Sequence, residues 1–369
     1  MSILTIGFIG LGLIGGSIAK AIHVKLPEIK CIAYQSKDSN DNTIKQAIKD
    51  QVIFDATPDL AILTRECDII FLCAPVLNNI EYLSLLKEHI TENTIITDVG
   101  SVKSNIHKAA ASLGLNGCFI GGHPMAGSEK TGYHNSSELL LENAYYILTV
   151  TDELPKDDVL MVSQLIEKIG ALPVVLNASA HDDIVAAISH VPHIIASSLV
   201  NMVRAKDDSK ERMKVLAAGG FKDITRIASS SPIMWQNICL SNTESILDFL
   251  SHYENQLSLI KTLIANKDEA GLLSFFEGAK DYRDNLPLRS KGLLSEVYEV
   301  YVDIFDETGA IATIATILAT NQVSIKNIGI LHNREFEQGV LRIELYDEEA
   351  QKKANTLLKS RGYVLYEKK

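Results

Sequence analysis

The chain has 369 residues, 46% of them hydrophobic and 22% charged, a composition typical of folded globular proteins. A formal net charge of −11 argues against a nucleic-acid partner, because no basic stripe is available to neutralise phosphates. Five scattered cysteines without a CxxC pair indicate reduced thiols and no metal site, and no run approaches the about 18 apolar residues of a membrane span. We therefore expect a cytoplasmic protein of two or three domains, with neither a secretion signal nor a membrane helix.

A first apolar run predicts a strand that leads into a glycine-rich turn and then into a helix, SIAKAI. Gly10, Gly12 and Gly15 fall at GxGxxG spacing, with Leu13 and Ile14 before the last glycine. In this context Gly10 permits the turn, Gly12 lets the backbone approach a pyrophosphate, and Gly15 lets helix and strand pack closely. The pattern predicts a dinucleotide whose phosphates lie on the free amides at the helix N-terminus.

The second predicted strand, Lys30–Tyr34, ends where an acidic residue normally holds the ribose hydroxyls of NAD. Here Gln35 takes that place, and it can still bond a ribose hydroxyl as a neutral group. Ser36 and Lys37 could reach the 2′-phosphate of NADP, and Asp38 could bind the ribose instead. The segment is alternatively a plain solvated loop, so both NAD and NADP remain open.

Strands continue to alternate with helices, which indicates a parallel sheet covered on both faces. Ala74 and Pro75 follow a buried strand and are expected to border the cofactor. Ser101 follows the next strand, at the carboxyl edge where such sheets bind ligands. It either caps a helix starting near Val102 or faces cofactor and substrate, and the two roles are compatible. Further strands are expected at 68–73, 94–99, 143–150 and 173–176, with helices at 80–89 and 157–169.

The densest cluster of candidate site residues is Gly121–Gly132, GGHPMAGSEKTG, which contains His123. We predict a strand that ends at the glycine pair and a crowded turn after it, close to a ligand. Histidine is the side chain best able to exchange a proton near neutral pH, so His123 is a candidate base. The alternative is a turn histidine that only caps backbone groups.

Residues 181–279 show helical spacing and no strand pattern. Within them, 184–203 is predicted as one long, buried helix, bent near Pro192. His190 fits a core histidine, whereas His193, about one turn further on, is a candidate for the site.

Residues 219–232 contain a second cluster. The glycines at 219–220 are expected to end one helix, and Ser231 with Pro232 to begin the next. Asp223 and Arg226 are three residues apart, so Asp223 could steer the guanidinium towards a substrate carboxylate, in a pocket lined by Trp235. A surface ion pair is the alternative.

From Pro232 to Asn266 the apolar positions predict a single long amphipathic helix, from which we infer a homodimer built through the helical domain. The last seventy or so residues read as βαββαβ, a ferredoxin-like sandwich. The predicted organisation is a Rossmann-type parallel-sheet domain at 1–177, an all-α substrate and dimerisation domain at 178–285, a linker at 286–296, and a small α/β domain at 297–369.

The motifs GLGLIGGS, DVGSVKS, GGHPMAGSEKTG, HDDIVAAISHVPH and GGFKDITRIASSSPIMW occur in this order, and with them the chain resembles the prephenate dehydrogenases over essentially its whole length. The resemblance implies oxidative decarboxylation of prephenate to 4-hydroxyphenylpyruvate, in tyrosine biosynthesis, and favours NAD over NADP. It matches His123 to the catalytic base and Ser101 to a serine that bonds the same substrate hydroxyl. It also places Arg226, His193 and Ser128 around the substrate.

The tail after the linker resembles an ACT domain, a module that binds amino acids. Asp306, Gly309, Asn327 and Ile328 fit that pattern and would be regulatory residues. The implied effector is tyrosine, which would act through a population shift.

Three alternatives remain. Arogenate, the aminated relative of prephenate, differs far from His123, so the sequence does not separate the two substrates. A related β-hydroxyacid or imine reductase lacks the HPMAG cluster. A non-catalytic amino-acid sensor would have lost Ser101, His123 or Arg226.

Overall fold

The computed structural model describes residues 4–36, 42–91, 94–127, 130–285, 298–304, 308–331 and 339–366. Two compact units divide the chain, residues 1–290 and 291–369. Ser128 and Asp306, two of the predicted site residues, lie outside the described residues, as do Lys37 and Asp38.

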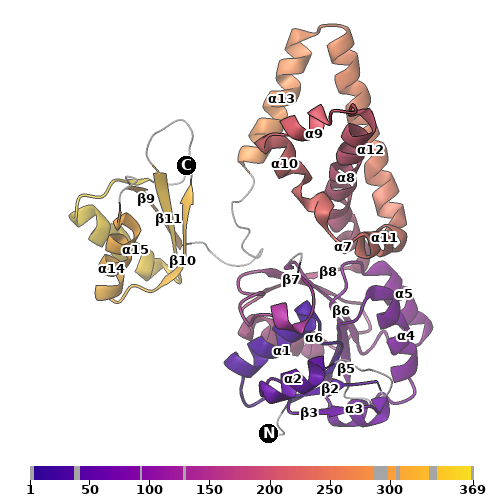
Figure 1. Cartoon of the computed structure of the whole chain (residues 1–369). Coiled ribbons are helices and arrows are strands. Elements are labelled where there is room, and N and C mark those ends of the chain that lie inside the picture. Colours follow the sequence, from indigo (N-terminus) through magenta and orange to yellow (C-terminus); the bar gives the residue numbers. More distant parts are fainter. Residues whose placement is uncertain are drawn as a thin grey trace. The chain divides into compact units, whose positions relative to one another are not determined.

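An eight-stranded sheet forms the first part of the larger unit, in the order β3-β2-β1-β4-β5-β6-β7-β8 (Figure 1). Its pairs are parallel except β6 with β7, which are antiparallel. The described connection between these two strands holds only the short helix η1, Tyr133–Asn135, and no crossover α-helix of the kind parallel neighbours need. The strands are β1 Thr5–Ile9, β2 Lys30–Tyr34, β3 Asp55–Thr57, β4 Ile69–Leu72, β5 Ile95–Asp98, β6 Phe119–Pro124, β7 Tyr145–Thr149 and β8 Leu172–Leu176.

Two hydrophobic cores lie on the two faces of this sheet. Ile18 and Ile22 of one helix and Val162 of another belong to the first core, whereas Leu63 and Leu83 belong to the second. The predicted doubly covered sheet is therefore confirmed, and its antiparallel pair is an addition to the prediction. The helices are α1 Leu13–Lys25, α2 Thr43–Lys49, α3 Leu60–Glu66, α4 Val76–Leu86, α5 Ser104–Ser112 and α6 Lys156–Lys168.

Residues 178–284 are helical, and no strand forms within 181–279, as predicted (Figure 1). The elements are α7 Ala178–Val185, the π-helical turn η2 Ala186–His190, α8 Val191–Lys206, α9 Arg212–Leu216, α10 Gly219–Thr225, the 3-10 helix η3 Arg226–Ser229, α11 Pro232–Ser241, α12 Thr243–Ala265 and α13 Glu269–Asp284.

Three predicted boundaries in this part are wrong. The helix expected at 184–203 extends from Ala178 to Lys206 and is only partly buried. The wide turn η2 lies just before Pro192, where we predicted a bend, because Pro192 has no amide hydrogen to donate to the preceding turn. Gly219 and Gly220 begin α10 instead of ending a helix, and neither has the positive φ of a C-terminal cap glycine. The helix expected at 232–266 is broken at Asn242, whose buried side chain bonds to residues outside both helices.

The stretch Ala178–Lys206 is long and apolar enough to span a membrane by length and composition, with 29 residues and a mean hydropathy of 1.4. It carries the buried polar side chains of His181, Asp182, His190 and His193. These side chains contact other residues of the protein, as the polar groups of a core helix do.

The smaller unit has the predicted βαββαβ order, with an antiparallel sheet in the order β10-β11-β9-β12. Both helices pack on this sheet through apolar side chains that include Ile314, Leu318 and Leu358. The elements are β9 Tyr298–Ile304, α14 Ala310–Thr320, β10 Ile325–Leu331, β11 Gly339–Leu345, α15 Glu348–Ser360 and β12 Leu365–Tyr366.

Candidate active site

The glycine-rich turn between β1 and α1 has the geometry of a dinucleotide site. Gly10 has a φ of +97°, and a Cβ there would lie 3.0 Å from the backbone of Cys73. A Cβ on Gly15 would collide with the carbonyl oxygen of Gly10, whereas one on Gly12 would meet nothing within 4 Å. Gly10 therefore permits the tight turn, Gly15 permits the close packing, and Gly12 borders open space.

The N-terminus of α1 is free to bind phosphate. The N-cap residue, Gly12, has no side chain to bond the free amides, and the first turn, which begins with Leu13 and Ile14, contains no acidic residue. The amides and the positive end of the helix dipole are thus available to a pyrophosphate, so this chain's residues fit NAD. Gly16, which the sequence analysis passed over, packs against Tyr133 and Ser136 with no room for a Cβ.

The other predicted cofactor residues lie at the ends of β2 and β4. The amide of Gln35 donates to Thr57 of β3 at 2.9 Å, and the side chains of Gln35 and Ser36 are half-buried. The loop at Ala74 and Pro75 is held by Asn79, whose Oδ1 accepts from the amide of Ala74 at 3.1 Å.

His123 lies in a strand, not in the turn that we expected. It belongs to β6, opposite Ile147 of β7, and its side chain is half-buried. The preceding glycines serve close packing: a Cβ on Gly122 would collide with the backbone of Asp98, and one on Gly121 with Thr149. The glycine pair therefore lets neighbouring elements approach the strand, a known use of glycine within sheets.

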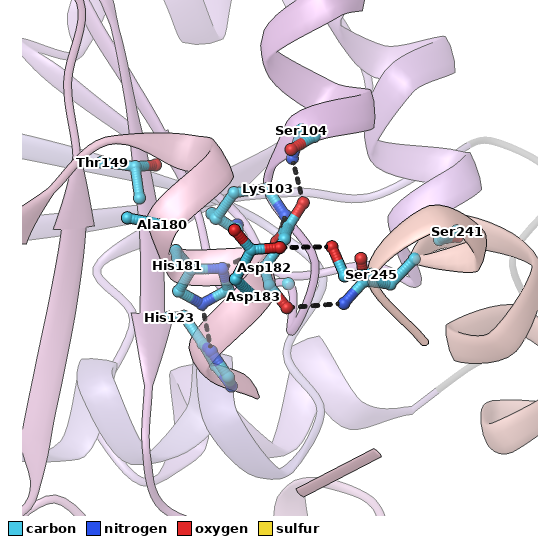
Figure 2. A network of polar contacts seen from close by, with 12 residues as sticks. Lys103, Ser104, His123, Thr149, Ala180, His181, Asp182, Asp183, Ser241 and Ser245 are labelled. Atoms are coloured by element: carbon cyan, nitrogen blue, oxygen red, sulfur yellow. Dashed lines mark hydrogen bonds and ion pairs between the residues drawn. The ribbon is translucent and has the colours of Figure 1, made fainter. Parts of the chain in front are cut away.

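Three side chains form a hydrogen-bonded chain that begins at His123 (Figure 2). Its Nδ1 lies 2.8 Å from Nε2 of His181, on α7. Nδ1 of His181 lies 2.8 Å from Oδ1 of Asp182. His181 and Asp182 are buried.

Asp182 also caps α5. Its Oδ1 accepts from the amide of Lys103 at 2.8 Å, and its Oδ2 accepts from the amide of Ser104 at 2.7 Å. The cap that we predicted from Ser101 is absent, because α5 begins two residues later than expected and its N-cap side chain makes no capping bond. Ser101 is half-buried in the loop between β5 and α5.

A buried ion pair supports the strand that carries His123. Nζ of Lys103 lies 2.6 Å from Oδ1 of Asp98 and donates to the carbonyl oxygen of Gly122 at 2.8 Å. Asp98 in turn accepts from the amides of Gly100 and Gly122. Both charged side chains are fully buried.

Burial and nearby charges keep His123 neutral. Burial, followed by the charges of His181, Lys103 and His190, holds the pKa of His123 well below its ordinary value, with Asp182 acting in the opposite direction. Burial alone would raise the pKa of Asp182, but hydrogen bonds from His181, Ser104 and Lys103 lower it overall. Near neutral pH, His123 is therefore an unprotonated imidazole and Asp182 an anion.

The predicted substrate residues of the helical part fall into two groups. His193 stacks on Trp235 with ring centroids 3.5 Å apart, beside a hollow of about 490 Å³. Asp223 on α10 and Arg226 on η3 are exposed. In the described part of the chain, no hydrogen bond or ring contact joins His193 or Trp235 to His123.

Sequence reasoning missed Asp98, Lys103, His181 and Asp182. The string HDDIVAAISHVPH carries part of the family resemblance, but the predictions for it concerned only His190 and His193. The adjacent His-Asp pair at its start is the available signal, since a carboxylate beside an imidazole often orients it.

Two family descriptions match most of the chain. The prephenate dehydrogenase nucleotide-binding domain matches residues 18–175, and the prephenate dehydrogenase dimerization domain matches residues 177–278. A prephenate dehydrogenase of Bacillus subtilis (strain 168) is 39% identical over 360 residues, 97% of this chain and 96% of the relative.

Two solved structures of similar enzymes agree with these family matches. A prephenate dehydrogenase from A. aeolicus, in complex with hydroxyphenyl propionate and NAD+, is 30% identical with a TM-score of 0.72, covering 78% of this chain and 99% of that one. An arogenate dehydrogenase from Synechocystis is also 30% identical, with a TM-score of 0.69, covering 76% of this chain and 99% of that one. With the turn geometry and these matches together, the chain belongs to the prephenate dehydrogenase family and is an NAD-dependent oxidoreductase.

Proposed function

We propose that His123 is the general base of prephenate oxidation. The observation that carries this proposal is the position of its ring: Nδ1 is engaged by His181, whereas Nε2 has no hydrogen-bond partner among the described residues. A neutral imidazole with a free nitrogen can accept the proton of the substrate hydroxyl.

The residues then act in a simple sequence. Nε2 of His123 takes the hydroxyl proton, and the hydrogen on the same ring carbon leaves as hydride. NAD supplies the hydride acceptor. Breaking the bond between the ring and its carboxylate releases CO₂ and sends the electron pair through the ring to the former hydroxyl oxygen. That oxygen takes the proton back from His123, which leaves an aromatic phenol. Ser101 bonds the same hydroxyl or orients His123, and base catalysis of this kind contributes about 10²–10⁴-fold.

The helical part of the larger unit would bind the carboxylates of the substrate. Arg226 offers a guanidinium for bidentate binding, with Asp223 steering it and His193 and Trp235 lining the pocket. Ser128, outside the described residues, would add a hydroxyl. Arogenate is the alternative substrate, and an arogenate dehydrogenase stands among the similar structures.

The same proposal includes tyrosine as a feedback effector of the smaller unit. Its βαββαβ order supports an ACT domain, and Gly309 is the N-cap residue of α14, with a φ of +92°. Asn327 and Ile328 lie on β10, beside a register shift in its pairing. We expect tyrosine to lower the rate without binding at His123.

The exposed apolar surface of the helical part supports a homodimer. Val215 and Leu216 of α9 are 75% and 77% exposed, and Ile233 and Leu240 of α11 are 72% and 70% exposed. A homodimer would cover these side chains, since monomers rarely expose large apolar patches. The five free cysteines favour a cytoplasmic enzyme.

Initial rates of reduced-cofactor formation test the proposal, with prephenate and arogenate each paired with NAD and NADP, with and without tyrosine. We expect the highest rate with prephenate and NAD, lowered by tyrosine. We also expect His123→Asn to lower turnover by at least about a hundredfold while leaving NAD binding intact. Near-normal turnover in this variant would reduce His123 to a structural residue.

A further inference from the structure

We propose that His181 and Asp182 are positioning residues that fix the tautomer of His123, so that its Nε2 is the unprotonated nitrogen. The proposal rests on the proposed role of His123 as the base. It adds that the base depends on the docking of α7 against the N-terminus of α5.

The argument starts at the carboxylate. The carboxylate of Asp182 accepts from the backbone amides of Lys103 and Ser104, and an amide N–H can only donate. These bonds fix the side chain as an acceptor on both oxygens. Nδ1 of His181, 2.8 Å from the same Oδ1, must therefore donate its hydrogen to the carboxylate.

The tautomer of each ring then follows from that of its neighbour. A neutral imidazole has one donor and one acceptor nitrogen. In the neutral form of His181, the hydrogen donated from Nδ1 is the only one on the ring nitrogens. Its Nε2 then accepts, and the nitrogen 2.8 Å away, Nδ1 of His123, must donate. The lone pair of His123 is thereby left on Nε2, the nitrogen without a partner among the described residues.

The same chain balances the charge that forms during the reaction. The ammonium of Lys103 disfavours a proton on His123, whereas the carboxylate of Asp182 favours one. The other nearby carboxylate, Asp98, is bound to the ammonium of Lys103. The imidazolium that His123 becomes is therefore stabilised chiefly by Asp182, through the bridging ring of His181.

Docking of the helices places Asp182. Its carboxylate serves as the missing cap of α5, and its carbonyl oxygen accepts from Nδ2 of Asn242 at 2.8 Å. The neighbouring Asp183 accepts from Ser245 at 2.8 Å (Figure 2). The break between α11 and α12 thus holds α7 in place, and any separation of α7 from α5 removes the acceptor that sets the tautomer.

Asp182→Asn in the full chain tests the proposal. The amide group presents a donor to Nδ1 of His181, which reverses both rings and puts the hydrogen on Nε2 of His123. We expect kcat for prephenate to fall at least about a hundredfold with KM and NAD affinity nearly unchanged, since the equivalent change in a serine protease costs about 10⁴-fold. Proton–nitrogen NMR of the ring nitrogens should show the hydrogen of His123 on Nδ1 in the parent chain and on Nε2 in the variant.

Matched variants keep the test decisive if Asp182→Asn folds poorly. Asp183→Asn makes the same substitution one residue away, and its amide oxygen can still accept the hydrogen bond from Ser245, so this control should retain parental kcat. His181→Gln keeps a donor towards Asp182 and an acceptor towards His123, so it should retain far more activity than His181→Leu. Equal losses in these two variants, or a parental hydrogen on Nε2 of His123, would overturn the proposal. If His123→Asn is inactive but Asp182→Asn is not, the base stands and the positioning role fails.

Discussion

Removal of the buried ammonium of Lys103, which supports β6, should destabilise the protein and lower its turnover. In Lys103→Met the chain keeps a side chain of similar length, but Asp98 loses the ammonium that contacts it at 2.6 Å. Both side chains are fully buried, so an uncompensated carboxylate would remain. Breaking a buried pair from one side costs about 3–5 kcal/mol.

The remaining amide donors to Asp98, those of Gly100 and Gly122, place the cost near the lower end of this range. At a cost of about 3 kcal/mol and about 2–4 °C per kcal/mol, the midpoint of thermal unfolding should fall by roughly 6–12 °C. Turnover should fall as well, because Nζ of Lys103 also holds the carbonyl oxygen of Gly122, next to His123.

Calorimetry and urea unfolding measure the loss, and the double variant Lys103→Met/Asp98→Asn provides the comparison. Removing the second charge should recover part of the loss, giving a coupling of about 0.5–3 kcal/mol. A single variant that costs under about 1 kcal/mol, or a double variant whose losses simply add, would refute the view that this ion pair supports the site.

Three further predictions concern cofactor, substrate and pH. Gly15→Ala should weaken NAD binding, measured by fluorescence titration, because its Cβ would collide with the carbonyl of Gly10; unchanged affinity would remove this turn from the cofactor site. Arg226→Ala should mainly raise KM for prephenate in initial-rate assays, and an unchanged KM would move carboxylate binding elsewhere. Burial lowers the pKa of His107 and of His190 to about 4. Because the unfolded chain then takes up protons first, the free energy of unfolding should be highest above pH 6.5 and fall between pH 6.5 and 4, at about 1.4 kcal/mol per pKa unit for each histidine. Urea unfolding across this range should show no such fall if both rings are protonated when folded.

The sequence predicts most of the fold because its elements rest on local patterns. The turn at Gly10 and Gly15 is encoded by neighbours a few residues apart, and the structure places both glycines where a Cβ would not fit. The βαββαβ order of the smaller unit is encoded in the same way, by apolar spacing and turn residues. Such signals do not depend on where distant parts of the chain lie.

The misplacement of His123 has a different cause. Two glycines before His-Pro read as a turn, because glycine is usually selected for its backbone freedom. At Gly121 and Gly122 neither φ is positive, and the absent side chains instead make room for Thr149 and the backbone of Asp98. Only the paired strands reveal which neighbours these are.

Long-range contacts also explain why the partners of His123 escaped the sequence analysis. His181 and Asp182 are 58 and 59 positions further along, on a helix whose apolar pattern points only to a core. Their chemistry arises when one carboxylate caps α5 and bonds an imidazole at once. Because Asp182 performs both tasks, the start of α5 and the position of the hydrogen on His181 depend on the same carboxylate. The expectation that Ser101 caps this helix failed for the same reason: the capping group comes from a different part of the chain, and so does the group that sets the base.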